Sequence, residues 1–170
     1  EKVKVTFTNR GGDIISYELL DHKDGDVYVQ MADNITESNR AFSVAFGSSS
    51  DGIINDIFNV KQIDDKTIGF YKTFIVNNED GTTSSFVLAK QYTFKDDDYI
   101  FRLDISIDGD ETMKELVFGN TAYTVRTSPQ IGPAYNAKSD RYEYRSFMSF
   151  ENDKTKKVRL AAGQTKIYDK

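Results

Sequence analysis

Hydrophobic side chains recur at every second position through the middle of this chain. The alternation runs through residues 68–76, 85–94 and 99–107, and polar residues at 77–81 and 95–98 separate these stretches. Because successive side chains of a β-strand point to opposite faces of a sheet, a period of two predicts strands with one buried face. We therefore expect a meander of three long antiparallel strands joined by short polar turns.

Shorter stretches of the same kind extend this pattern toward both ends of the chain. Further strands are predicted at residues 3–7, 15–19, 28–31, 42–46, 115–118, 122–127, 142–150 and 158–160. Strands at roughly ten-residue spacing, joined by polar turns, predict a sandwich or a barrel. Because the strand lengths vary and the turns differ, two packed antiparallel sheets are favoured, with at most one or two short helices.

Several local features carry more specific expectations. Asn9 to Asp13 supplies residues that tolerate a positive φ and predicts the turn of a first hairpin, after which Ile15, Tyr17 and Leu19 should share one face. Charged loops are predicted at 21–26 and 154–157, and a short helical turn is allowed at 53–58.

Length and charge restrict the class of protein. The chain has 170 residues and no cysteine, which predicts one domain over 1–170 without disulfides or thiolate metal sites. The formal net charge of −5 argues against a nucleic-acid partner, which would need a basic surface. No apolar run approaches the roughly 20 residues that span a bilayer. The opening at Glu1 without a methionine predicts a soluble domain that is either cut out of a longer protein or processed.

Residues able to carry catalysis are few. His22 is the only histidine and stands in a charged run, so we expect a solvated loop residue and no catalytic site. Consecutive carboxylates at Asp96 to Asp98 predict a turn, since an acid and base pair needs two differing environments. Metal and cofactor sites are not expected either, because zinc needs three or four ligands and Gly11-Gly12 does not open a helix. The chain is therefore predicted not to be an enzyme.

One group of side chains resembles a binding surface. Tyrosines and arginines, the usual anchors of protein interfaces, gather near the two prolines at Arg126, Tyr135, Arg141, Tyr142 and Tyr144. The alternative is that the rings are core residues covered by the stems of the arginines. We predict that these five residues contact a partner.

Four segments together resemble a known family. These are residues 8–14 with the Asn-Arg-Gly-Gly-Asp turn, the strand and return at 86–101, and the stretches at 119–123 and 129–133. Their order and spacing are similar to the periplasmic domain of bacterial YidC-type membrane protein insertases. The resemblance covers roughly Val3 to Leu160.

The resemblance implies a β-supersandwich on the periplasmic face of the bacterial inner membrane, within a multi-pass membrane protein. It further implies that this domain performs no chemistry, docks on subunits of the Sec translocon and holds nascent membrane proteins. Supersandwich folds also serve sugar mutarotases and carbohydrate-binding modules, so a sugar-binding domain is the alternative function. The flanking sequence of the gene would separate the two, through transmembrane segments or a neighbouring hydrolase domain.

Overall fold

The computed structural model describes residues 1–48, 50–78, 80–109, 121–127, 138, 147–151 and 153–158. Internal contacts divide the chain into two compact units, Glu1–Pro133 and Ala134–Lys170. The first unit holds the strands β1 Val3–Thr8, β2 Asp13–Asp24, β3 Val27–Gln30, β4 Ser43–Phe46, β5 Asn59–Asp64, β6 Thr67–Asn77, β7 Thr83–Phe94, β8 Phe101–Gly109 and β9 Tyr123–Arg126. The second holds β10 Phe147–Glu151 and β11 Lys154–Val158. The described residues include no helix, and the all-β prediction is confirmed.

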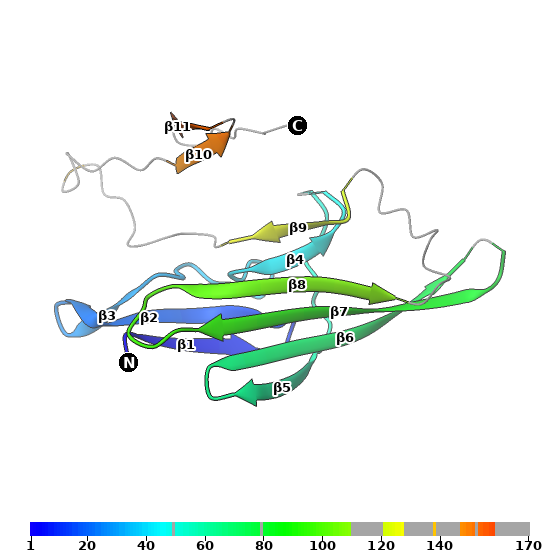
Figure 1. The fold of residues 1–170 in the computed structure, drawn as a ribbon, viewed down its shortest axis with the longest axis horizontal. Coiled ribbons are helices and arrows are strands. Elements are labelled where there is room, and N and C mark those ends of the chain that lie inside the picture. The colour runs from blue at the N-terminus through cyan, green and yellow to red at the C-terminus, as the bar shows by residue number, and fades with distance from the viewer. Residues whose placement is uncertain are drawn as a thin grey trace. The chain divides into compact units, whose positions relative to one another are not determined.

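Antiparallel sheets make up the first unit (Figure 1). One sheet has the order β1-β2-β3, a second has the order β5-β6-β7-β8, and β4 pairs with β9. The ring of Phe7 on β1 lies 5.4 Å from that of Phe70 on β6 and 4.9 Å from that of Tyr92 on β7, measured between centroids. The three-stranded and four-stranded sheets therefore pack against each other, as expected for an antiparallel β-sandwich. In the second unit β10 pairs with β11.

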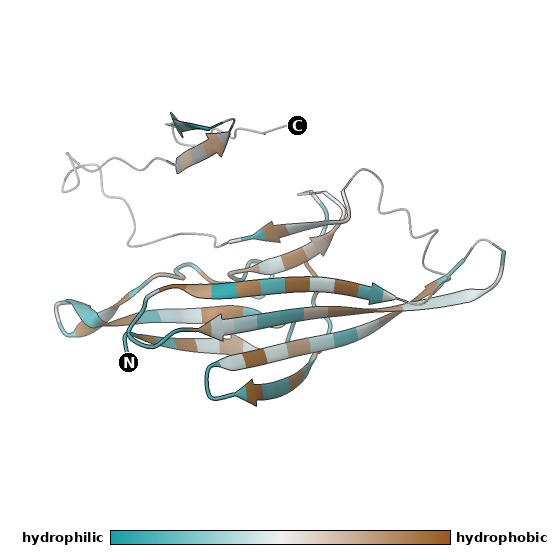
Figure 2. Ribbon diagram, in the orientation of Figure 1, coloured by the Kyte–Doolittle hydropathy of each residue, from teal (hydrophilic) through white to brown (hydrophobic). Residues whose placement is uncertain are grey.

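The predicted meander is confirmed as β6, β7 and β8, which are adjacent in the four-stranded sheet. Hydrophobic and hydrophilic bands alternate along these strands in Figure 2. On β7 the even-numbered side chains from Ser84 to Tyr92 are buried, and Lys90 lies among them with no exposed surface. On β8 the side chains of Phe101, Leu103 and Ile105 are half-buried and pack against the core, so this register also holds.

The predicted face of the second strand is wrong at its first residue. Ile14 is fully buried, whereas Ile15 is 37% exposed. A β-bulge is the cause, because Thr6 pairs with Ser16 while Phe7 pairs with Ile14. Ile15 is the extra residue, and it breaks the alternation that the sequence alone predicts.

Three further local predictions, a loop, a helical turn and a basic turn, also differ from the structure. β2 continues to Asp24, so the charged run at 21–26 is mostly strand, with a tight turn at Gly25. Residues 53–58 form no helical turn, and Ile57 instead bridges to Arg10. The lysine-rich run at 154–157 lies in β11. The predicted strand at 115–118 and the first part of the one at 142–150 lie outside the described residues. The single domain over 1–170 stays a prediction.

Gly12 in the first turn lies directly against the facing sheet. Its φ is +64°, and a Cβ built there would lie 2.6 Å from Cβ of Phe70. Gly25, in the β2–β3 turn, has nearly the same φ of +62° but no atom within 4 Å of such a Cβ. The two glycines share a left-handed backbone and differ in the space around them.

We expect Gly12→Ala to lower the free energy of unfolding by more than Gly25→Ala does. Both substitutions place a Cβ in the left-handed region, at a cost of about 1–2 kcal/mol. Only Gly12→Ala adds a clash with Phe70, which should raise its total by a further ~1–3 kcal/mol. Urea unfolding of both variants measures the difference directly. Equal losses would show that the Gly12–Phe70 approach is not a constraint on the fold.

Candidate functional site

The most chemically distinctive group of side chains is a buried ion cluster of Asp13, Arg40 and Lys90. Asp13 and Lys90 have no exposed surface, and Arg40 is 3% exposed. Lys90 Nζ donates to Oδ1 of Asp13, to the carbonyl oxygen of Gly11 at 3.0 Å and to that of Phe42 at 2.8 Å. All three N–H groups of this ammonium thus have an acceptor, which is the condition for burying such a charge.

Arg40 occupies the other oxygen of the same carboxylate. Its Nε donates to Asp13 Oδ2 at 2.9 Å, and its two terminal nitrogens donate to the carbonyl oxygens of Glu37 and of Ile54, the latter at 3.2 Å. Phe42 has a φ of +59°, which is uncommon for a bulky residue. Its carbonyl is one of the three acceptors of Lys90. The cluster therefore joins the first turn, the segments before β4 and β5, and the central strand β7.

This cluster resembles an active site in its composition, but its side chains are buried and a substrate could not reach them. Burial lowers the pKa of Lys90, and the nearby Asp13 carboxylate opposes that shift. A lysine with a lowered pKa can act as a nucleophile when it lies in a cleft. None of the three residues lines either of the two pockets described below. The arrangement therefore serves the fold.

We predict that Lys90→Met costs much more stability than Lys4→Met. The first leaves a buried carboxylate with one cation fewer, at a cost of about 3–5 kcal/mol. The second removes the exposed Lys4–Glu18 pair, whose atoms lie 3.3 Å apart, at a cost of about 1 kcal/mol or less. Chemical denaturation of both variants gives the comparison. Similar small losses would mean that the cluster does not hold the sheets together.

Tyr92 lies beside the cluster and is fully buried. Its hydroxyl donates to the carbonyl oxygen of Gly12 at 2.9 Å. Burial raises the pKa of Tyr92 well above its ordinary value, and the Asp13 carboxylate adds to this effect. The phenol is therefore neutral in the folded chain at pH values where a solvated tyrosine ionises.

The raised pKa predicts a loss of stability in alkali. Above about pH 10 the unfolded chain releases the Tyr92 proton while the folded chain keeps it, so the free energy of unfolding falls as pH rises. Each pH unit in this range lowers the free energy of unfolding of the wild type by up to about 1.4 kcal/mol. The Tyr92→Phe variant has no phenol at this position, so it should not show this loss. Denaturant unfolding at several pH values between 9 and 11 tests this. Parallel curves for the two proteins would contradict the prediction.

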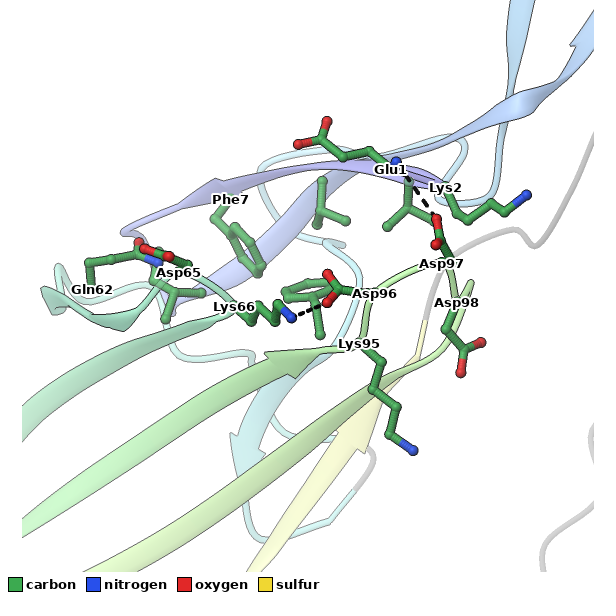
Figure 3. Close-up of a pocket in the computed structure, with 14 residues that line it drawn as sticks. Glu1, Lys2, Phe7, Gln62, Asp65, Lys66, Lys95, Asp96, Asp97 and Asp98 are labelled. Atoms are coloured by element: carbon green, nitrogen blue, oxygen red, sulfur yellow. Dashed lines mark hydrogen bonds and ion pairs between the residues drawn. The ribbon is translucent and has the colours of Figure 1, made fainter.

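A groove opens along β1, the edge strand of the three-stranded sheet (Figure 3). Its volume is about 720 Å³. The lining comprises apolar side chains inside and charged ones around them: Glu1, Lys2, Val3, Val5, Phe7, Gln62, Asp65, Lys66, Ile68, Phe94, Lys95, Asp96, Asp97 and Asp98. We call this the edge groove. Figure 3 shows Phe7 pointing from β1 into it.

The edge groove follows from how the two sheets are joined. Just after β1, the N–H of Gly11 donates to the carbonyl oxygen of Asp56 at 2.9 Å, and the N–H of Phe58 donates to that of Asn9 at 2.8 Å. These bonds link the end of β1 to the segment before β5. Further along, β1 and β5 belong to different sheets, and each is an edge strand among the described strands. The groove lies where this pairing has ended.

Charges around the edge groove are mostly acidic. Five carboxylates and three lysines belong to its lining, together with the N-terminal ammonium of Glu1, which lies 3.9 Å from Asp97. Lys66 forms an ion pair with Asp96, and Lys2 forms one with Asp21. Both lysines donate hydrogen bonds to these carboxylates, which raises the pKa of both lysines, so they stay charged at neutral pH. Negative charge therefore exceeds positive charge at this groove.

A second pocket, of about 450 Å³, is apolar. It is lined by Tyr17, Leu19, Met31, Ala32, Ala41, Phe42, Tyr99, Ile100, Phe101, Leu103 and Thr127. The Tyr17 hydroxyl donates to the carbonyl oxygen of Tyr99 at 2.6 Å and joins β2 to the start of β8. This pocket lacks the charged rim of the edge groove.

The structure places one of the five predicted partner residues. Arg126 lies half-buried on β9 and donates to the carbonyl oxygen of Asp51 at 2.7 Å. Tyr135, Arg141, Tyr142 and Tyr144 lie outside the described residues, and their role stays a prediction. The sequence predicts Val3, Val5 and Phe7 as one face of a strand but does not predict the edge groove, because no local pattern shows which strand forms an edge.

His22 and the acidic turn lie at the surface, as predicted, but His22 belongs to β2 and not to a loop. His22 is exposed in the last part of β2, with its ring 5.6 Å from that of Tyr99. Asp98 accepts from the N–H groups of Tyr99 and Ile100 and so shapes its own turn. In the described part of the chain, no group of three histidine, aspartate or glutamate side chains could hold a metal ion. The described residues also contain no helix long and apolar enough to cross a membrane.

Two curated proteins are similar to nearly the whole chain. It is 46% identical over 171 residues to the membrane protein insertase YidC of Treponema denticola, covering 96% of this chain and 29% of that protein. It is 37% identical over 193 residues to the membrane protein insertase YidC of Treponema pallidum, covering 93% of this chain and 31% of that protein. The chain thus spans about a third of the length of these relatives. No family model matches the chain. No solved structure matches it either.

Proposed function

The chain is a homologue of one segment of the YidC membrane protein insertases, and we propose on this premise that it is their non-catalytic periplasmic docking and holding domain. The domain would be part of a multi-pass protein of the bacterial inner membrane. Its partners would be nascent membrane proteins, which it holds in extended form, and subunits of the Sec translocon, on which it docks. The insertion step itself would belong to the remaining two thirds of the protein.

The edge groove is the observation that carries the holding role. A segment leaving the membrane is extended and exposes apolar side chains. The groove offers it the side chains of Val3, Val5 and Phe7 at one sheet edge, within reach of solvent. Main-chain contacts at a strand edge do not demand one sequence, so many substrates could use the same site. Such contacts are weak, and attachment to the same membrane would compensate by raising the effective concentration.

Docking on the translocon is assigned to a different set of residues. The proposed contact residues are Arg126, Tyr135, Arg141, Tyr142 and Tyr144, whose aromatic rings and guanidinium groups suit a protein interface. Arg126 also holds the backbone of Asp51, so its substitution would disturb the fold locally. The tyrosines are therefore the cleaner positions at which to test docking.

Site-specific photocrosslinking in the full-length insertase tests the holding role. A photoreactive residue at Val5 should crosslink to a nascent membrane protein during synthesis, because Val5 lines the groove. The matched control is Ile75 on β6, an apolar residue that is 72% exposed and lies outside the groove. We expect adducts from position 5 and only background from position 75. Equal labelling, or none from position 5 with insertion intact, would contradict the holding role.

A further inference from the structure

We propose that the edge groove binds an extended peptide as an additional antiparallel strand beside β1, with apolar residues alternating with lysine or arginine. This inference rests on the proposed holding function and specifies its chemistry. The occupant would extend the three-stranded sheet to four strands. Three features of the described residues lead to it: the direction of the β1 main-chain groups, the row of apolar side chains and the charge of the rim.

The main chain of β1 has one free side. The N–H of Leu20 on β2 donates to the carbonyl oxygen of Lys2 at 2.9 Å. In an antiparallel ladder, hydrogen-bonded residues alternate along the strand, so Lys4, opposite Glu18, also bonds to β2. The N–H and C=O groups of Val3 and Val5 therefore point to the other side of β1. No described strand pairs there.

The same residues direct apolar side chains into the groove. Val3, Val5 and Phe7 line it from β1, while Ile68 and Phe94 line it from the facing sheet. An added strand would place every second side chain in line with this row and against the facing sheet. Those positions favour apolar residues, whereas the alternate ones face solvent. The groove thus selects a period of two in its ligand.

The rim determines the charge of the ligand. Five carboxylates face three lysines, and two of these lysines are already paired with aspartate. Asp97 is 82% exposed at its side chain and lies 3.9 Å from the N-terminal ammonium of Glu1, so a ligand cation would replace or join an exposed ion pair there. Lysine or arginine at the solvent-facing positions would match this surface. The expected affinity is modest and should fall with added salt, because exposed charges are screened.

The ends of β1 limit the length of the ligand. The strand has six residues, and the bonds of Asn9 and Gly11 to the segment before β5 close the groove at one end. A segment of about six residues fits between this closure and the open end. A second copy of the chain could also pair through β1, and the experiment distinguishes that occupant.

Selective methylation of peptide amides tests strand addition. The probe is an acetylated octapeptide that alternates valine and lysine, with its binding to the 170-residue chain followed by fluorescence anisotropy. Two further peptides carry N-methyl groups on the valine amides only or on the lysine amides only. An antiparallel strand whose valines face the groove pairs with Val3 and Val5 through its valine amides. Methylation of these should weaken binding by about tenfold or more, and methylation of the lysine amides by less than about twofold.

Two variants of the chain locate the binding site. Val5→Pro removes an outward N–H that β2 does not use, and Val5→Thr keeps it, so only the first should lose binding. Circular dichroism of both variants checks that they remain folded. Asp97→Asn should weaken binding and reduce its salt dependence, while asparagine still tolerates the φ of +51° at this position. Full binding by Val5→Pro, or unchanged salt dependence in Asp97→Asn, would place the peptide elsewhere.

The outcomes separate this inference from the proposed function. If both methylated peptides bind like the parent while nascent chains still crosslink at position 5, strand addition is wrong and holding stands. If no peptide binds and position 5 gives no crosslink, both are wrong. If no peptide binds but the crosslink persists, the ligand chemistry proposed here is wrong. If the chain elutes as a dimer that Val5→Pro dissociates, the edge binds a second copy and the inference is also wrong.

Discussion

The buried carboxylate of Asp13 is the interaction on which the rest of the first unit depends. Its two oxygens accept from Lys90 on the central strand β7 and from Arg40 in the segment before β4. Each cation also binds backbone carbonyls, so four stretches far apart in sequence meet within one cluster. A buried charge without these partners would be very costly, which makes the arrangement cooperative. The glycine turn at residues 11–12 is needed because it lets the backbone approach the core closely enough to bury Asp13.

This cluster also explains where the sandwich can remain open. It fixes the first turn against β7, and the backbone bonds of Asn9 and Gly11 then fasten the same turn to the segment before β5. Beyond that point β2 is the only described strand that pairs with β1, and the main-chain groups on the other side of β1 have no described strand beside them. The position of the ion cluster thus accounts both for the end of the edge groove that is closed by backbone bonds and for the unpaired side of β1.

A holding site formed from a sheet edge differs from a catalytic pocket in what it must specify. The side chains that carry unusual electrostatics, Asp13, Lys90 and Tyr92, are sealed inside and stabilise the scaffold. The residues that line the groove carry apolar side chains, lysines and a larger number of carboxylates. Such groups recognise the extended conformation and a general pattern of charge, and they do not distinguish one peptide sequence from another with high selectivity. This division matches the proposed role of a domain that meets many different membrane proteins.

The sequence by itself determined the all-β class, the long meander and the first hairpin, because a period of two and glycine-rich turns are local properties of the chain. The resemblance to YidC-type insertases was also available from the residues alone. Only the tertiary structure decided which strands form the edges, that Ile15 is displaced by a bulge, and that Asp13, Arg40 and Lys90 form one cluster. These features depend on pairing between residues up to 77 positions apart, such as Asp13 and Lys90. A charged residue inside an alternating strand has the same local pattern whether it meets solvent or a buried counterion, so only the packing of the sheets distinguishes them.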